Sequence, residues 1–333
     1  MTPGVAVDRI PSGVLQEADV VERVVLAITL CLGLVPLAAC EGGGAGAHRQ
    51  IPTADSGRTR VVMLGTGTPN ADPRRSGPAV AIVVGDRSYI VDAGPGVVRR
   101  AAAAAEQGID ALAPRALRTV FLTHLHSDHT VGLPDLIFTP WVLERDVPLA
   151  LFGPPGSEAM VAHLLAAFEE DIRIRLDGLE PANPAGYRVT VTEVSEGVVY
   201  DDGTVRVTAF PVPHGSWPVA LGYRFDTPDR SIVVSGDTRY TDAIVRACDG
   251  CDILIHEVYS EAGFARRDSV WKTYHASFHT SSSELAELAA LARPGLLILY
   301  HQLLWGTTPD ELVAEVRRGW DGDVVFGEDL QVF

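Results

Sequence analysis

Lysine is almost absent from this sequence of 333 residues. Lys272 is the single lysine, the other 26 basic residues are arginine, and 43 acidic residues give a net charge of −16. The arginines nowhere gather densely enough to form a basic stripe. Because an acidic surface repels polyanions at long range, this composition argues against nucleic acid as a partner.

The first apolar run is too short to span a membrane. Residues 24–39 are sixteen uncharged, mostly apolar residues, whereas a membrane-spanning helix needs roughly 20. The run ends in Leu37-Ala38-Ala39-Cys40, which resembles the bacterial lipobox, and the glycine-rich "EGGGAGAHRQ" follows. We therefore expect a lipoprotein-type signal peptide (1–39), lipidation of Cys40 and a flexible tether (40–58). This interpretation predicts a lipid-anchored protein of the bacterial cell envelope.

The residues before this run depart from the usual signal peptide. Four acids and two arginines occupy residues 1–23, where a positively charged segment is expected. A true translation start near Val20 or Val21 would explain the departure. A short N-terminal membrane helix is the alternative, and both interpretations place the remaining chain outside the cytoplasm.

Cysteine is scarce, with four residues in the chain. Cys31 lies in the apolar run, and Cys248 and Cys251 form a C-x-x-C sequence. Outside the cytoplasm this pair can form a disulfide, and no thioredoxin-like context surrounds it. We expect structural cysteines at a turn, paired or not.

Residues 59–333 show no linker, repeat or coiled-coil pattern, so we expect one domain. Short apolar runs that end in glycine, such as "AVAIVVG", are typical of buried strands. Two capping boxes predict helix starts at Ser281 and Thr308.

Polar residues follow six of the apolar runs. They are Asp92, His124, His214, Asp237, His256 with Glu257, and His301. Because loops at the carboxyl ends of strands build the active sites of α/β sheets, we expect these side chains to converge.

The stretch "THLHSDH" (123–129) is the densest group of metal ligands. An isolated histidine is usually an ordinary core or surface residue, but four ligands in six residues are hard to explain as packing. Histidine and aspartate without thiolate favour zinc, manganese or iron. His124 and His126 are two apart in extended backbone and can chelate one ion, while Asp128 and His129 can reach a second.

These motifs resemble those of the metallo-β-lactamase fold hydrolases, and within them the ribonuclease Z and arylsulfatase-like branch, from about Arg60 to Phe333. The matching motifs are Asp92 in "IVDAG", "HLHSDH", His214, Asp237 in "SGDT" and His301, with "LGTGTP" (64–69), "FGPPG" (152–156), "HE" (256–257) and "HTS" (279–281) pointing to the branch.

The resemblance implies an α/β fold, a four-layer αββα sandwich, with two Zn²⁺ ions at one edge, Mn²⁺ or Fe²⁺ being possible. One ion would take His124, His126 and His214. The other would take Asp128, His129 and His301, with Asp237 between the two. Two such ions give a hydroxide nucleophile near neutral pH.

A leaving group also needs a proton. We expect His279 to donate it, with Asp128 orienting the ring; His275 competes for the role, and a polar loop residue is the alternative for His279. Asp92 would be structural, and His256 and Glu257 would hold ligands by hydrogen bonds.

The motifs predict the substrate class less directly than they predict the metal site. Family β-lactamases generally lack an aspartate at the position of Asp237, which disfavours that activity. Residues 157–201, where ribonuclease Z enzymes carry a basic arm, hold nine acids and three arginines. We therefore expect hydrolysis of small anionic esters, phosphodiesters or aryl sulfates, as the main activity. A ribonuclease Z-type tRNA 3′-processing endonuclease is the alternative, and a non-catalytic metal-binding envelope lipoprotein is the second. The oligomeric state stays open.

Overall fold

The computed structural model describes residues 58–333. The expected signal peptide (1–39), Cys40 and the tether up to residue 57 lie outside the described residues. The division into a signal peptide, a tether and a domain therefore stays a prediction.

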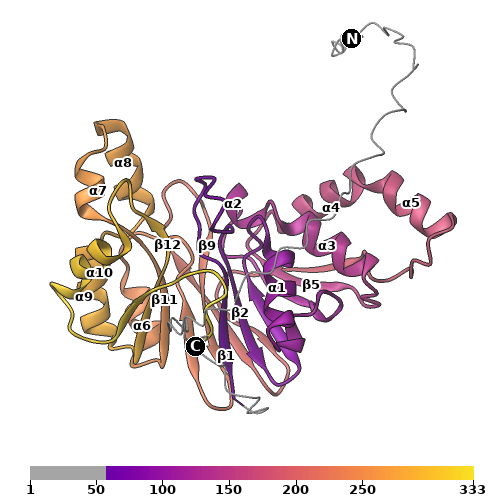
Figure 1. Ribbon diagram of the computed structural model, residues 1–333, viewed down its shortest axis with the longest axis horizontal. Helices are drawn as coiled ribbons and strands as arrows, with labels where there is room; N and C mark the ends of the chain where they lie inside the picture. The colour runs from indigo at the N-terminus through magenta and orange to yellow at the C-terminus, as the bar shows by residue number, and fades with distance from the viewer. Residues whose placement is uncertain (1–57) are drawn as a thin grey trace, which may run out of the picture. The chain divides into compact units, whose positions relative to one another are not determined.

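Two β-sheets face each other in the described part of the chain (Figure 1). The first, in spatial order, contains β1 (Arg60–Gly65), β2 (Ala79–Val84), β3 (Arg87–Val91), β4 (Thr119–Phe121), β5 (Leu149–Gly153) and β6 (Val189–Glu193). The second runs from β13 (Val324–Phe326) through β12 (Leu296–Leu303), β11 (Ile253–Tyr259), β10 (Ser231–Val234), β9 (Ala220–Asp226) and β8 (Arg206–Val212) to β7 (Gly197–Asp201).

Helices cover the outer face of each sheet, and some extend beyond the sandwich. In chain order they are α1 (Val97–Glu106), α2 (Ser127–Thr130), α3 (Leu133–Val142), α4 (Ser157–Ala167), α5 (Glu169–Asp177), α6 (Asp242–Cys248), α7 (Glu261–Ala265), α8 (Ser269–Phe278), α9 (Ser282–Ala292) and α10 (Pro309–Arg317). Short 3₁₀ helices lie at Asp110–Leu112 and Pro114–Ala116.

Three apolar cores hold the layers together. Strand β2, AVAIVV, is buried at every position because both of its faces are covered. One core joins the first sheet to α1 and α3, a second fills the space between the sheets, and a third joins the second sheet to α6, α9 and α10. This is the predicted four-layer αββα sandwich.

Parallel strands bring the functional residues to one edge. Strands β3 to β6 are parallel to one another, as are β10 to β13.

Both predicted capping boxes are present, at the starts of α9 and α10. The helices α7 and α8 extend beyond the sandwich at the upper left of Figure 1.

Two strand ends differ from the prediction. The sequence predicts that β11 and β12 end before His256 and His301, but both residues lie inside their strands. The strands continue because β11 and β12 go on pairing past the apolar runs, with a register shift after Glu257. His301 takes a positive φ of 44° at this irregularity, which changes the direction of its side chain.

Cys248 and Cys251 form a disulfide at the end of α6, which settles the alternative left open by the sequence. Across residues 58–333, every helix is too short or too polar to cross a lipid bilayer.

Candidate metal centre

The motif that follows β4 folds into a turn and then into α2. His126 is the N-cap residue of α2, and its φ of −61° and ψ of 149° are those of the extended backbone predicted for it. Asp128 and His129 lie in the first turn of α2. The motif is therefore split between a strand end and a helix, and it presents its ligands in two directions.

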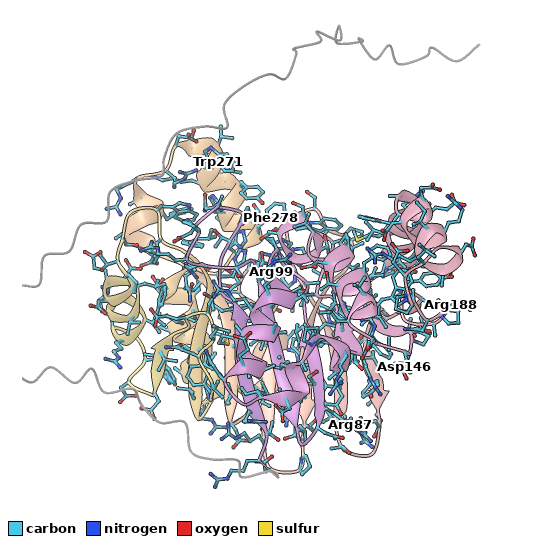
Figure 2. All side chains as sticks on the ribbon, turned by 45° about the vertical axis from the view of Figure 1, so that its right-hand side comes forward. Arg87, Arg99, Asp146, Arg188, Trp271 and Phe278 are labelled. Carbon is cyan, nitrogen blue, oxygen red and sulfur yellow. A yellow bond between two sulfur atoms is a disulfide. The ribbon has the colours of Figure 1, made fainter. Side chains whose placement is uncertain are left out.

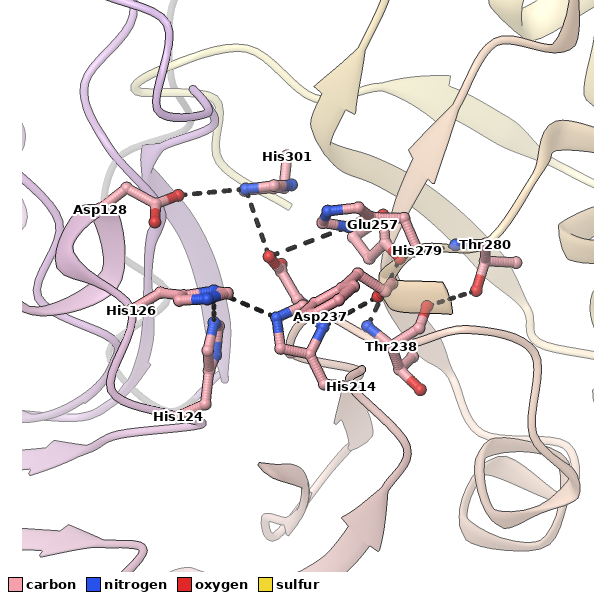
Figure 3. Close-up of polar contacts among 12 residues, drawn as sticks. His124, His126, Asp128, His214, Asp237, Thr238, Glu257, His279, Thr280 and His301 are labelled. Atoms are coloured by element: carbon pink, nitrogen blue, oxygen red, sulfur yellow. Dashed lines mark hydrogen bonds and ion pairs between the residues drawn. The ribbon is translucent and has the colours of Figure 1, made fainter. Parts of the chain in front are cut away.

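Three imidazoles form the first cluster (Figure 3). Nε2 of His124 lies 3.0 Å from Nδ1 of His126. Nε2 of His214, from the loop after β8, lies 3.1 Å from the same atom. These donor atoms and a carboxylate oxygen of Asp237 all lie within 4.8 Å of one another, a spacing that suits one metal ion.

A second cluster lies on the other side of Asp237. Nε2 of His301 is 3.2 Å from Oδ2 of Asp128 and 3.4 Å from Oδ2 of Asp237. Nε2 of His129 is 3.3 Å from the same Asp237 oxygen. All seven ligands predicted from the sequence thus meet in two groups, and Asp237 is shared between them.

The chemistry of these donors fits divalent metal ions. Nε2 of His129 and Oδ1 of Asp237 are buried and have no hydrogen-bond partner among residues 58–333. Such orphaned atoms are costly unless a ligand satisfies them. Burial lowers the pKa of His124 well below its usual value and that of His214 to about 4, so both imidazoles are neutral near pH 7 and can offer a lone pair.

His129 behaves differently. Burial alone would lower its pKa, but the carboxylates of Asp237 and Asp92 outweigh burial and raise it well above the usual value. Without metal, His129 therefore carries a proton between two carboxylates, which a metal ion would displace.

Surrounding groups orient the ligands through their outer nitrogens. Asp92 accepts hydrogen bonds from the backbone and hydroxyl of Thr123, and its Oδ2 lies 2.8 Å from Nδ1 of His129. Nδ1 of His124 lies 3.0 Å from the Thr123 hydroxyl. Nδ1 of His214 lies 2.8 Å from the carbonyl of Phe278. Asp92 therefore has the structural surroundings expected of it, whereas the sequence analysis missed Thr123, which directly precedes the motif.

The prediction that Asp128 orients the ring of His279 is wrong. Asp128 contacts His301 and His129, whereas Nδ1 of His279 lies 3.4 Å from Oε2 of Glu257 and 4.0 Å from Oδ2 of Asp237. Glu257 continues the alternation of Ile253 and Ile255, which face the core between the sheets, and its carboxylate therefore points into the site from β11.

Two backbone amides fix the Glu257 carboxylate. Its Oε1 accepts the N–H of Thr280 at 2.8 Å and, more weakly, that of Thr238 at 3.4 Å. Burial raises the pKa of Glu257 well above its usual value, and burial lowers that of His279 well below. Both shifts favour a protonated Glu257 carboxyl beside a neutral imidazole.

His256 does not join this network. Its Nδ1 contacts the carbonyl of Glu257 at 2.6 Å, and no hydrogen bond within residues 58–333 joins it to a predicted ligand. Because neighbouring side chains of a strand point to opposite faces, aiming Glu257 at the site turns His256 away from it. The expected role of His256 in holding a ligand is therefore wrong.

Similar proteins support this description. The model of the β-lactamase superfamily domain matches residues 87–302. A ribonuclease Z of Mycobacterium sp. (strain KMS) is 37% identical over 247 residues, which is 73% of this chain and 84% of the relative. A ribonuclease Z of Mycobacterium avium (strain 104) is 34% identical over 275 residues, which is 81% of this chain and 96% of the relative.

Solved structures share the fold. The metallo-β-lactamase fold protein YhfI from Bacillus subtilis superposes with a TM-score of 0.61 and 19% identity, covering 83% of this chain and 99% of that protein. The short form of human tRNase Z gives a TM-score of 0.61 and 22% identity, over 82% of this chain and 98% of that protein. The chain belongs to the β-lactamase superfamily and, among its metallo-hydrolases, to the ribonuclease Z branch.

Proposed function

We propose that this protein is a metal-dependent phosphodiesterase of the ribonuclease Z type that cleaves RNA, the alternative expected from the sequence. The observation that carries the proposal is the buried pair of His279 and Glu257 beside Asp237, where the two ligand clusters meet. The names of the curated relatives favour phosphodiester over aryl-sulfate chemistry.

The seven ligands would hold two divalent ions. When bound, such ions lower the pKa of a water molecule and polarise the scissile phosphate. Asp237 lies between both clusters, and nearby histidines hold its pKa well below the usual value against the effect of burial, so it stays ionised. An ionised carboxylate in this place can contact both ions.

His279 supplies the proton that the leaving oxygen needs. Its Nδ1 faces Glu257, so the other ring nitrogen, Nε2, remains for the substrate. As the P–O bond breaks, the leaving oxygen takes the proton of Nε2 while Nδ1 takes the proton of the Glu257 carboxyl. The two backbone amides at Oε1 then stabilise the carboxylate that forms.

The test is turnover by the metal-loaded full-length protein. A precursor tRNA and bis-p-nitrophenyl phosphate should be cleaved, and p-nitrophenyl sulfate should not. Asp237→Ala should abolish turnover, and His279→Ala should lower kcat by about 10²-fold or more. His163→Ala, an exposed histidine on α4, is the matched control. Absence of turnover with two ions bound would instead support the non-catalytic alternative.

A second candidate function is hydrolysis of small phosphodiesters, favoured by the charge of α5. Helix α5 begins with three acidic residues, Glu169, Glu170 and Asp171. Two of its arginines are paired within the helix, Arg173 with Glu170 and Arg175 with Asp171. Such a surface repels RNA. Cleavage of bis-p-nitrophenyl phosphate without cleavage of the precursor tRNA would favour this candidate.

For the second candidate, whose small substrates are not confined to the cytosol as precursor tRNA is, we also propose export to the cell envelope with a lipid anchor on Cys40. The disulfide between Cys248 and Cys251 supports this location, because disulfides persist in oxidising compartments. Fractionation of cells should find the protein with the membranes, and Cys40→Ser should release it. A reduced Cys248–Cys251 pair in the soluble cytosolic fraction would contradict the proposal.

A further inference from the structure

Aromatic rings run along α8 from its exposed end to the metal centre. The ring centroids of Trp271 and Tyr274 are 5.7 Å apart, and those of Tyr274 and Phe278 are 4.4 Å apart with nearly parallel planes. Phe278 then lies 4.9 Å from the ring of His214. Figure 2 shows Trp271 near the tip of the protruding helices and Phe278 closer to the sandwich. The series spans about 10 Å along the helix axis.

The outer end of this series is exposed. Trp271 has an exposed fraction of 46% and its neighbour Val270 one of 76%. Large apolar side chains on a protruding helix are costly in water and commonly mark a binding surface. Trp271 is therefore placed for contact with another molecule rather than for packing alone.

A buried histidine beside the series has unmade hydrogen bonds. His275 is 6% exposed, and neither ring nitrogen has a hydrogen-bond partner in the part of the chain that the structure describes. Its ring lies 5.6 Å from that of Trp271 and 4.3 Å from that of Trp305. Buried polar atoms without partners are rare, and here the indoles on either side offer ring faces rather than acceptors. A bound molecule with polar ring atoms could satisfy them.

Positive charge gathers at the same place in a strongly acidic protein. The guanidinium of Arg267 lies 5.3 Å from the ring of Trp271 and 5.6 Å from that of Trp305, and its Nε is buried without a partner among residues 58–333. The exposed Arg266 follows α7, and Lys272, the only lysine in the sequence, lies on α8; the three basic residues outnumber Asp268, the acidic residue between the two helices. An anionic molecule is attracted to this part of the surface.

We propose that Trp271, Tyr274, His275 and Arg267 form a subsite for the nucleobase of a nucleotide next to the scissile phosphodiester. The base stacks on Trp271, its polar edge reaches His275, and Arg267 faces the anionic backbone. This inference rests on the proposed phosphodiesterase function and names the part of the substrate that the protein recognises.

A lipid surface is the other kind of partner that an exposed tryptophan and a lysine could contact. Two observations favour the nucleobase. The rings lead inward to the ligand His214, and His275 keeps buried polar atoms that a hydrocarbon chain could not satisfy. A membrane contact requires neither feature.

The test compares two substrates that share a leaving group. The metal-loaded full-length protein is assayed with thymidine 5′-(p-nitrophenyl phosphate) and with methyl p-nitrophenyl phosphate. Trp271→Ala should lower the ratio of kcat/KM for the first substrate over the second by about ten-fold or more. His275→Phe, which keeps the ring and removes both nitrogens, should lower the same ratio. Phe168→Ala, at an exposed aromatic residue beside α5, should leave the ratio unchanged.

Binding of thymidine 5′-monophosphate, measured by calorimetry on wild type and Trp271→Ala, separates the two proposals. If wild type cleaves neither substrate, the proposed function fails, and loss of nucleotide binding in Trp271→Ala would still support the subsite. An unchanged substrate ratio together with unchanged nucleotide binding would overturn the subsite. So would binding to phospholipid vesicles that Trp271→Ala abolishes while the ratio stays the same.

Discussion

Trp217 donates its indole N–H to Nε2 of His126 at 2.8 Å, on the side of the ring opposite the candidate metal position. A neutral imidazole carries one proton, so acceptance at Nε2 places that proton on Nδ1. Nδ1 is the atom that faces His124 and His214. Ligation through Nδ1 moves the proton to Nε2, and Trp217 then loses its acceptor.

Metal binding should therefore change the fluorescence of Trp217. Titration of the metal-free protein with Zn²⁺ is expected to change the tryptophan emission, and excess chelator should reverse the change. In Trp217→Phe most of the change should disappear, while Zn²⁺ binding measured by calorimetry persists. An identical emission change in both proteins would show that the indole keeps its contact.

Loss of the Asp92 carboxylate should weaken metal binding without unfolding the protein. Asp92 orients His129 directly and supports His124 through Thr123. Because Asp92 has a positive φ of 63°, which asparagine also tolerates, Asp92→Asn is the suitable variant. We expect Zn²⁺ affinity to fall by about 10- to 100-fold in competition with a fluorescent chelator. Unchanged affinity with a native circular dichroism spectrum would contradict this role.

Arg145 should be important for stability although it is not a metal ligand and pairs with no carboxylate among residues 58–333. It is fully buried, and burial lowers its pKa to about 10. Its guanidinium donates to four backbone carbonyls, those of Leu117, Leu136, Ile137 and Gly186.

Arg145→Met removes the guanidinium donor from these buried carbonyls. Each carbonyl that water cannot reach then destabilises the folded state by roughly 1–3 kcal/mol. We expect the free energy of unfolding in urea to fall by about 3 kcal/mol or more. Arg118→Met, at an exposed arginine 4.0 Å from Asp146, should change it by less than about 0.5 kcal/mol. Equal effects of the two substitutions would refute the interpretation.

Asp202 should make the free energy of unfolding depend on pH in the acidic range. Its carboxylate accepts hydrogen bonds from Tyr89 at 2.6 Å, from Arg87 at 2.7 Å and from two backbone amides. Burial would raise its pKa, but the hydrogen bond from Tyr89 and these other donors lower it below the usual value. A depressed native pKa gives stability that is present above the unfolded pKa of about 3.9 and is lost as pH falls.

Asp202→Asn is expected to lower the free energy of unfolding by about 1 kcal/mol at pH 7. The difference from wild type should shrink as pH falls from about 5 through the unfolded pKa of about 3.9 and below it. Thermal unfolding across this range measures it, and Asp146→Asn, an exposed carboxylate, serves as the control. A constant difference at all pH values would argue against the carboxylate charge as the cause.

The sequence was sufficient to predict the metal ligands but not the residues that contact the site from other segments. His124, His126, Asp128 and His129 are close in the chain, and His214 and Asp237 directly follow apolar runs, so local pattern predicts their meeting. The pairing of His279 with Glu257 joins the residue after α8 to a residue of β11 that lies 22 positions earlier, which the pattern of neither segment records. The contact between Trp217 and His126 joins residues 91 positions apart.

The order of the strands divides the described chain into two consecutive halves. Strands β1 to β6 build one sheet and β7 to β13 the other. The earlier half contributes His124, His126, Asp128 and His129, and the later half contributes His214, Asp237 and His301. Neither half alone carries a complete ligand set for either ion. Bound metal would therefore hold the two halves together, and metal binding would be coupled to folding. A chelator would thus weaken the association of the two sheets as well as abolish hydrolysis.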